Sequence, residues 1–431
     1  MSTENLASST VRTTARDVVV VCPTEYGGQL EHAADLALAL DDSPAVRRVT
    51  LVSRRGARSY LGWDEQHPVR VVETVPPRRT GTPSSRAAAV ARAGLQVLDL
   101  LREHVAVRRA AQQAGRDAVV ALDSTKYPAP GLLRAHRTQR TVVFVHNAQP
   151  HFDLGSASAR ERVLMWLEHS CARHADRVVT HGAEQGEIVR GYTARPVNAV
   201  DLPVSSRLDG DPAGESSHRE SPAHEPYALC LGEVRANKGI ELAMDAAGHA
   251  GVPLLVRGAA ESPELGQDLL RRAAQYPSVD FEDRFLSRDE FAAHLREAAV
   301  IVLPYTHFDA HSGVLAKAIG TGTPVVASDL ASLRAQAGDF PGFVGVDVHD
   351  RDAFGAALRA AFDAATSDDA ARVAGTRDAG TPDRGAADPH ADWWPSVAAV
   401  LGTNTATTPR PRRGTGDGAA AHGHRDAADH S

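Results

Sequence analysis

Cysteine, methionine, lysine and aromatic residues are all scarce in this chain of 431 residues. The three cysteines, Cys22, Cys171 and Cys230, lie far apart in the sequence. This spacing excludes a disulfide framework and a cysteine-rich zinc site, and it suits a reducing compartment. No stretch approaches the ~20 apolar residues of a membrane-spanning helix, and the first 16 residues lack the apolar core of a signal peptide. We therefore expect a globular, cytoplasmic protein.

Charge of neither sign dominates the composition. Lysine and arginine total 47 against 54 acidic residues, for a net charge of −7, which argues against a general nucleic-acid partner. Only Lys126, Lys238 and Lys317 are lysines. Hydrophobic residues make up 42% and charged residues 23%, so most of the chain can bury a core. The length favours two domains.

Short β-branched runs alternate with longer helical stretches in two regions of the chain. In the first region strands are expected at residues 18–21, 49–52, 118–121, 141–145 and 177–180. In the second region strands are expected at residues 227–231, 253–257, 279–281, 300–303 and 324–327. This alternation predicts an α/β fold with two doubly wound parallel sheets, each Rossmann-like.

Shifts in composition divide the chain further. A Trp393-Trp394 pair opens a short apolar segment that we expect to dock on the protein body as a helix. The expected parts are a disordered leader at 1–16, an N-terminal domain at 17–205, a linker at 206–224, a C-terminal domain at 225–385, the docking helix at 386–402 and a disordered tail at 403–431.

Two loops of the second region are candidate phosphate sites. In residues 232–239, Arg235 and Lys238 lie three positions apart and could clamp a diphosphate, although an ordinary solvated turn explains the spacing equally well. After the strand at 300–303, Ser312 and Gly313 open a helix whose free N–H groups could bind an anion. A plain serine N-cap is the alternative interpretation.

The first region offers weaker signals. Gly27 and Gly28 follow the first strand. They could form a loop that approaches a ligand closely, and a simple tight turn explains them equally well. They form no G-x-G-x-x-G pattern, so no nicotinamide or flavin cofactor is expected. His146 follows a strand and could be structural, or could join His151 in a metal cluster. No carboxylate or cysteine stands at ligand spacing beside them, so we predict no metal.

Taken together, these motifs resemble those of retaining GT-B glycosyltransferases of the family-4 type, also called glycosyl transferases group 1. Residues 322–326 have the Gly-x-Pro-Val-Val turn of that family. An exopolysaccharide-type subgroup is more similar still, with a Gly-x-Ile-Arg-x-Tyr-Lys-Gly loop (compare 232–239), a Ser-Gly-x-Leu helix start (312–315) and a His-Asn-x-x-Pro-His run (146–151). The resemblance spans about residues 17–402.

The resemblance implies roles for individual residues. Arg235 and Lys238 would hold the donor diphosphate, His146 would touch the transferred sugar, and the C-terminal helix would cross back onto the N-terminal domain. The implied catalytic residues are Arg235, Lys238, His146 and Asp309, and the implied donor-binding residues are Gly27, Gly28, Gly232, Ser312, Gly313 and Val314.

One departure from the family pattern concerns its two glutamates, which fall at Asp309 and Lys317. Asp309 can still accept hydrogen bonds from sugar hydroxyls, but the ammonium of Lys317 has no acceptor for the ribose hydroxyls. Either the ribose is held otherwise, or the choice of nucleotide has changed, or the protein is no longer catalytic.

The resemblance implies an enzyme that moves a sugar from a nucleoside-diphosphate sugar to a polysaccharide or lipid-linked acceptor, with retention and without a metal. A nucleotide-sugar epimerase or hydrolase, with Glu25, Glu31 and Asp309 as its candidate carboxylates, is one alternative. A catalytically inactive GT-B binding module in polysaccharide assembly is the other. Arginine pairs at 54–55, 78–79 and 108–109 could form a basic face for a peripheral contact with the inner face of the membrane, or be solvated, salt-bridged surface.

Overall fold

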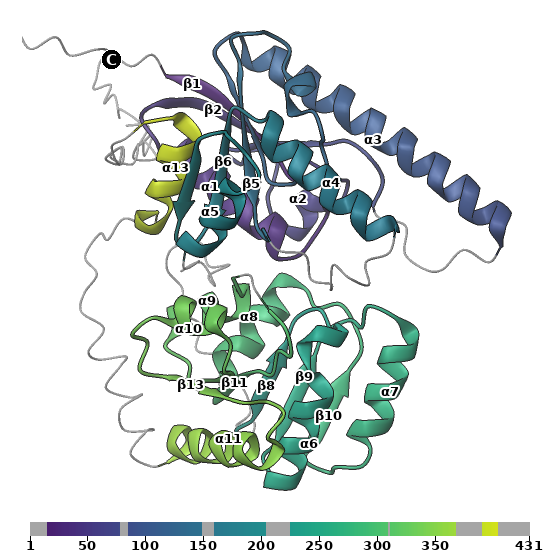
Figure 1. Cartoon of the computed structure of the whole chain (residues 1–431), viewed down its shortest axis with the longest axis vertical. Coiled ribbons are helices and arrows are strands. Elements are labelled where there is room, and N and C mark those ends of the chain that lie inside the picture. The colour runs from purple at the N-terminus through teal and green to yellow at the C-terminus, as the bar shows by residue number, and fades with distance from the viewer. Residues whose placement is uncertain are drawn as a thin grey trace, which may run out of the picture.

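The computed structural model describes residues 15–77, 85–148, 159–203, 225–308, 311–367 and 390–403. These residues form two α/β domains, one above the other in Figure 1, each built around its own parallel sheet. The expected linker at 206–224 and nearly all of the expected leader and tail lie outside the described residues. The predicted fold class, two Rossmann-like parallel-sheet domains, is confirmed.

The N-terminal domain has a seven-stranded parallel sheet in the order β3-β2-β1-β4-β5-β6-β7. Its strands are β1 (Arg16–Val21), β2 (Val46–Ser53), β3 (Arg70–Glu73), β4 (Val119–Leu122), β5 (Arg140–Val145), β6 (Arg177–His181) and β7 (Val197–Val200). Its helices are α1 (Gly28–Asp41), α2 (Ala57–Tyr60), α3 (Arg86–Ala114), α4 (Ala159–His174) and α5 (Ala183–Arg190), with a 3₁₀ turn η1 (Pro130–Leu133).

The C-terminal domain has a six-stranded parallel sheet in the order β10-β9-β8-β11-β12-β13. Its strands are β8 (Ala228–Leu231), β9 (Leu254–Arg257), β10 (Val279–Glu282), β11 (Val300–Leu303), β12 (Val325–Ser328) and β13 (Phe343–Val346). Its helices are α6 (Ile240–Ala250), α7 (Pro263–Ala273), α8 (Arg288–Glu297), α9 (Gly313–Thr321), α10 (Ala331–Ala337) and α11 (Arg351–Thr366), with a 3₁₀ turn η2 (Ala236–Lys238).

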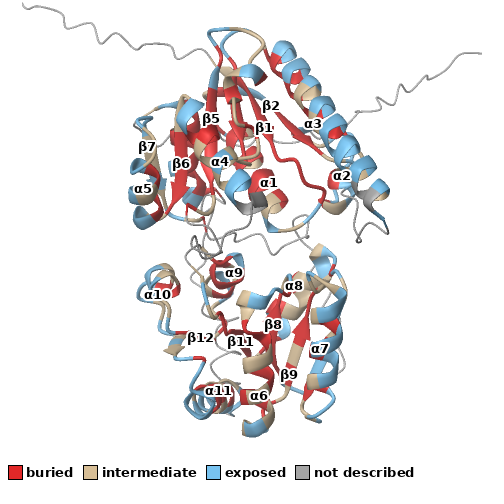
Figure 2. Ribbon diagram, turned by 45° about the vertical axis from the view of Figure 1, so that its right-hand side comes forward, coloured by how far each residue is buried: buried red, intermediate tan, exposed pale blue. Residues whose placement is uncertain are grey.

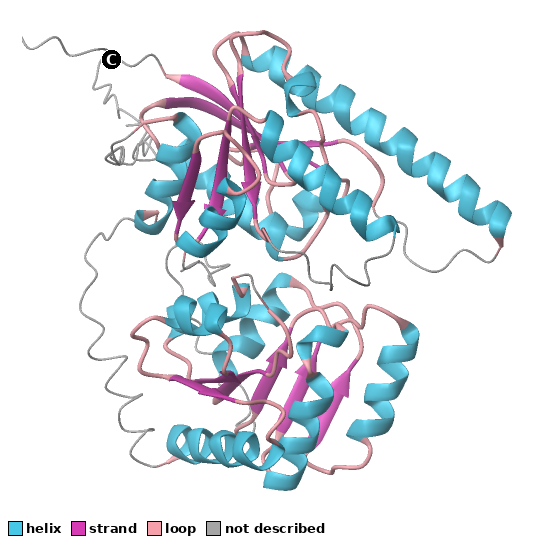
Figure 3. Ribbon diagram, in the orientation of Figure 1, coloured by secondary structure: helices cyan, strands magenta, loops and turns pink. Residues whose placement is uncertain are grey.

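Both sheets are covered by helices on their two faces, and their central strands are buried (Figures 2 and 3). Residues Val18–Val21 of β1 show why an interior strand is apolar. Val18 and Val20 belong to the core under α1, whereas Val19 and Val21 belong to the core under α3 and α4. Successive side chains of a strand point to opposite faces. When both faces are buried, the side chains on both faces are therefore apolar.

In each sheet the strand order reverses beside the first strand, between β1 and β4 and between β8 and β11. Open α/β sheets bind ligands at the carboxyl ends of the strands that flank such a switch point. The loops that leave β1 and β8 contain the Gly27-Gly28 and Arg235-Lys238 motifs. The fold therefore places the motifs from the sequence at the two positions that favour a ligand.

The last described segment, η3 (Ala391–Trp393) and α13 (Trp394–Leu401), packs on the N-terminal domain. Trp393, Trp394 and Val397 are buried in the same core as Val18 and Leu30. The segment follows the C-terminal domain in the chain and yet completes the core of the other domain (Figure 1). Among the described residues, no helix has both the length and the hydropathy that a membrane span requires.

We expect Trp394→Ala to destabilise the N-terminal domain by about 3–5 kcal/mol, because the side chain is 7% exposed and its loss leaves a cavity. Trp166→Ala is the matched control, since that side chain on α4 is 58% exposed and should change stability by less than about 0.5 kcal/mol. Thermal and urea unfolding of both variants measures the difference. Equal effects would contradict the packing role of α13.

Candidate functional site

The loop after β8 lies directly against the start of α9. Gly232 has φ +104°, and a Cβ built on it would lie 3.9 Å from Val314. Gly239 has φ +58°, and a Cβ there would lie 2.1 Å from the carbonyl oxygen of Pro304. Only glycine permits that approach, so the loops that follow the paired strands β8 and β11 interlock.

Lys238 joins these two loops through a chain of polar groups. Its Nζ donates a 2.7 Å hydrogen bond to the hydroxyl of Tyr305, and it lies 3.9 Å from the centroid of that ring. The Tyr305 hydroxyl is in turn 3.2 Å from Oγ of Ser312. The cation is therefore held beside the first turn of α9.

The start of α9 is an open helix N-terminus. Ser312 is its N-cap and accepts a 3.3 Å hydrogen bond from the N–H of Leu315. The N–H groups of Gly313 and Val314 have no acceptor among the described residues, and a Cβ built on Gly313 would meet no atom within 4 Å. Free N–H groups and the positive end of the helix dipole make this turn suitable for an anion.

Arg235 lies in the same loop as Lys238, with a half-exposed guanidinium. It forms a 2.5 Å ion pair with Glu233, whose side chain is 58% exposed. Exposed ion pairs of this kind are weak, so a diphosphate could displace the carboxylate. Asp309 lies outside the described residues, as does His151.

The N-terminal domain presents Gly27 and Gly28 at the start of α1. Gly27 has φ +87°, and a Cβ on either glycine would meet nothing within 4 Å. The neighbouring Tyr26 packs against Phe285 of the C-terminal domain with ring centroids 4.4 Å apart. The glycine turn is therefore open and stands next to a contact between the two domains.

A buried ion pair also crosses between the domains. Lys317 of α9 donates a hydrogen bond to Glu31 of α1, and their side chains are 16% and 12% exposed. The Tyr60 hydroxyl donates to the same carboxylate at 2.7 Å. Burial by itself would raise the pKa of Glu31, but Lys317 and Tyr60 hold that pKa below its ordinary value. The residue that departs from the family pattern is thus the partner of an acid in the other domain.

His146 follows β5 and lies next to a buried carboxylate at the end of β4. Its Nε2 is 2.7 Å from Oδ1 of Asp123, and Nδ1 of His32 is 3.0 Å from the same oxygen. Although burial opposes the shift, the two histidines lower the pKa of Asp123. Burial by itself would lower the pKa of His146, but the Asp123 carboxylate raises that pKa above its ordinary value. Asp123 therefore orients the imidazole of His146.

Sequence reasoning missed Asp123, Tyr305, His32 and His181. Asp123 and Tyr305 each come just after a buried strand, one and two residues on, and polar residues at that position were a usable signal. His32 and His181 lie on separate elements, and no local spacing relates them to His146.

Comparison with known proteins identifies the C-terminal domain. Residues 225–363 match the model of the family described as Glycosyl transferases group 1. The C-terminal domain therefore resembles the glycosyl transferases of group 1. A comparison of the sequence with curated proteins gives no match.

Solved structures resemble the chain across both domains. Sucrose-phosphate synthase from Thermosynechococcus elongatus is 17% identical with a TM-score of 0.56, covering 84% of this chain and 98% of its own. HepE from Anabaena, in complex with UDP-glucose, is 13% identical with a TM-score of 0.54, covering 84% and 100%. An α,α-trehalose-phosphate synthase (UDP-forming) from Burkholderia vietnamiensis is 13% identical with a TM-score of 0.55, covering 90% and 98%. At these identities the likeness shows the fold, which is GT-B.

We expect the Lys317–Glu31 pair to couple the two domains. Lys317→Met leaves the buried carboxylate of Glu31 without its cation, and Glu31→Gln leaves the buried ammonium of Lys317 without its anion. Each single variant should therefore have a lower melting temperature. The double variant should lose less free energy of unfolding than the two single variants together, with a coupling free energy of about 1–3 kcal/mol. Because the folded pKa of Glu31 lies below 4.5, the coupling should be constant at neutral pH and vanish only as the pH falls below that value.

The control for this cycle is Asp329 and Arg334, an exposed pair in the same C-terminal domain. Asp329→Asn, Arg334→Met and their double variant should show a coupling of about 0–1 kcal/mol. Purely additive effects at Glu31 and Lys317 would contradict the interdomain role. Melting temperatures between pH 3.5 and 8, chosen to bracket about pH 4.5, provide the comparison.

Proposed function

We propose that the protein transfers a sugar from a nucleoside-diphosphate donor to a polysaccharide or lipid-linked acceptor, with retention and without a metal. The observation that supports this proposal most directly is the anion-binding arrangement at the switch point of the second sheet. There Lys238 lies beside the first turn of α9 and Arg235 lies in the same loop as Lys238, within a domain that matches the group 1 model.

Lys238, Arg235 and the N–H groups of Gly313 and Val314 would stabilise the charge that develops on the departing diphosphate. An oxygen of that phosphate takes the proton of the acceptor hydroxyl, so no pair of catalytic carboxylates is needed. His146, held by Asp123, would contact the transferred sugar from the N-terminal side. Each of these groups occupies the carboxyl end of a strand or the start of a helix, where it is pre-oriented.

Recognition of the nucleotide would rely on backbone groups rather than on Lys317, and Asp309 would accept hydrogen bonds from sugar hydroxyls. The ammonium of Lys317 is engaged by Glu31 and accepts no hydrogen bond. The solved relatives HepE, with UDP-glucose bound, and the UDP-forming trehalose-phosphate synthase make a uridine donor the first candidate.

The acceptor side offers a surface that suits a lipid-linked glycan. Helices α3 and α4 both contact η1 and cover the same face of the first sheet. The two acids of α3, Asp99 and Glu103, are buried, so its exposed charges are all basic. Exposed apolar side chains on the two helices are Val90, Leu95, Val97, Leu98, Leu101, Val105, Val163, Leu164 and Trp166. We propose that this apolar and basic face contacts an anionic membrane.

Vesicle binding tests the membrane contact. The protein should sediment with vesicles that contain anionic phospholipid, less so with neutral ones, and less at high salt because exposed charges are screened. Leu101→Ser combined with Trp166→Ser should abolish binding, whereas Leu270→Ser on α7, also exposed, should leave it intact. Binding that survives loss of both apolar side chains would refute this surface.

Nucleotide binding and turnover test the main proposal. UDP-, GDP- and ADP-sugars are screened by thermal shift, and one class should raise the melting temperature by mass action. With that donor, Arg235→Ala and Lys238→Ala should each lower the transfer rate by ~10²–10³-fold. Arg271→Ala, on the surface of α7, is the control and should retain the native rate. Transfer should also persist in a chelator.

The other outcomes select between the alternatives. Native transfer rates in both Arg235→Ala and Lys238→Ala would refute the proposed role of these two residues in binding the donor diphosphate. Nucleotide binding without turnover on any acceptor would favour the inactive binding module, which the engagement of Lys317 by Glu31 supports. A sugar or epimer formed without an acceptor would favour an epimerase or hydrolase. A thermal shift that appears only in Lys317→Glu would mean that the native chain has lost its donor site.

A further inference from the structure

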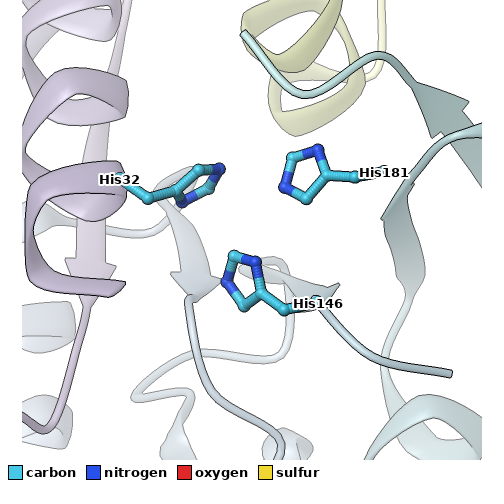
Figure 4. Close-up of side chains that lie close together, drawn as sticks. All are labelled: His32, His146 and His181. Atoms are coloured by element: carbon cyan, nitrogen blue, oxygen red, sulfur yellow. The ribbon is translucent and has the colours of Figure 1, made fainter. Parts of the chain in front are cut away.

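Three histidines from separate parts of the N-terminal domain face a common space (Figure 4). His32 lies in α1, His146 directly follows β5, and His181 ends β6. Their ring centroids lie 4.8, 4.9 and 5.3 Å apart in pairs. One ligand nitrogen of each lies within 4.8 Å of the other two. This cluster is formed by the carboxyl edge of the sheet, with no contribution from local sequence spacing.

Several polar atoms of the cluster are buried without a hydrogen-bond partner. Both nitrogens of His181, a residue only 1% exposed, are in this condition, as are both nitrogens of His32. A neutral imidazole has one N–H donor and one nitrogen acceptor, and a buried polar group left unsatisfied costs about 1–3 kcal/mol. One nitrogen of each ring faces a shared space (Figure 4), which indicates a ligand that bonds to nitrogen lone pairs.

Asp123 supplies the supporting interaction that metal-bound histidines usually have. Its Oδ1 faces Nδ1 of His32 at 3.0 Å and Nε2 of His146 at 2.7 Å. The hydrogen bond between Nε2 of His146 and Asp123 leaves Nδ1 of His146 as a lone-pair donor, whereas Nδ1 of His32 lies near the carboxylate without a hydrogen bond to it. A carboxylate that takes the second N–H fixes the tautomer of a ligating histidine and increases its basicity.

We propose that His32, His146 and His181 bind a transition-metal ion of the zinc class, with Asp123 as the residue that orients His146. Three neutral imidazoles suit zinc, cobalt, nickel and copper better than magnesium or calcium. Zinc–nitrogen bonds of about 2.0–2.1 Å place the ligand atoms roughly 3.3 Å apart. The rings therefore close on the ion by about 1 Å, and the fourth position remains open.

The site has a consequence for the transfer reaction, and this consequence rests on the proposed function. His146 serves both as a ligand here and as the proposed contact of the transferred sugar. An ion that occupies the cluster withdraws His146 from the sugar. Zinc should therefore inhibit transfer reversibly, while a chelator should restore the rate of the metal-free enzyme.

Cobalt titration of the chelator-treated full chain tests the site directly. Because His422 and His424 could also bind metal, the titration uses a parent in which both are replaced by asparagine. This parent should bind a single equivalent of Co²⁺ and develop the intense visible absorption of four-coordinate cobalt. His181→Gln should abolish this spectrum, and Asp123→Asn should weaken binding by about 10–100-fold. His349→Gln, at an exposed turn of the other domain, is the matched control and should leave both unchanged.

Folding defects are separated from ligand loss by a second measurement. Zn²⁺ should raise the melting temperature of the parent and of His349→Gln by mass action, and should not raise that of His32→Gln or His181→Gln. No cobalt spectrum in the parent, or a spectrum that survives in both histidine variants, would overturn the proposal. If the ion binds but zinc leaves transfer unaffected, the site stands and its link to His146 in the reaction is refuted.

Discussion

Burial of both faces of two parallel sheets is the constraint on which the rest of this structure depends. Strands such as Val18–Val21 are enclosed by helices on each side, so polar side chains cannot occupy their middle positions. Polar groups therefore collect where the strands end. Asp123, His146, His181 and Tyr305 all lie at or just beyond a carboxyl end, and Lys238, in the loop after β8, contacts Tyr305 there.

The two edges carry different chemistry. In the C-terminal domain Lys238, Arg235 and the first turn of α9 present positive charge, which suits the phosphates of a donor. In the N-terminal domain Asp123 and the histidines around it form a polar cluster closed over by Trp393 of the segment that crosses back. Lys317 and Glu31 join the two domains, so the position that departs from the family pattern contributes to interdomain contact.

Sequence patterns predicted the interior strands well and the edges poorly. The strands expected at 18–21, 141–145 and 300–303 coincide with β1, β5 and β11, because continuous apolar runs belong to strands enclosed on both faces. Strands β3, β7 and β13 were not expected. Each forms the edge of its sheet and has partly exposed residues, since an edge strand has a neighbour on one side only and needs fewer apolar side chains.

The sequence by itself determined the two-domain α/β fold, the loops that contain Arg235 and Lys238, and the helix start at Ser312, because each follows from local spacing beside an apolar run. Tertiary structure decided which distant residues meet. His32, His146 and His181 lie on three elements, and Glu31 and Lys317 lie in different domains. Such pairings depend on strand order and on how the domains face each other, and neither leaves a periodic signal in the chain.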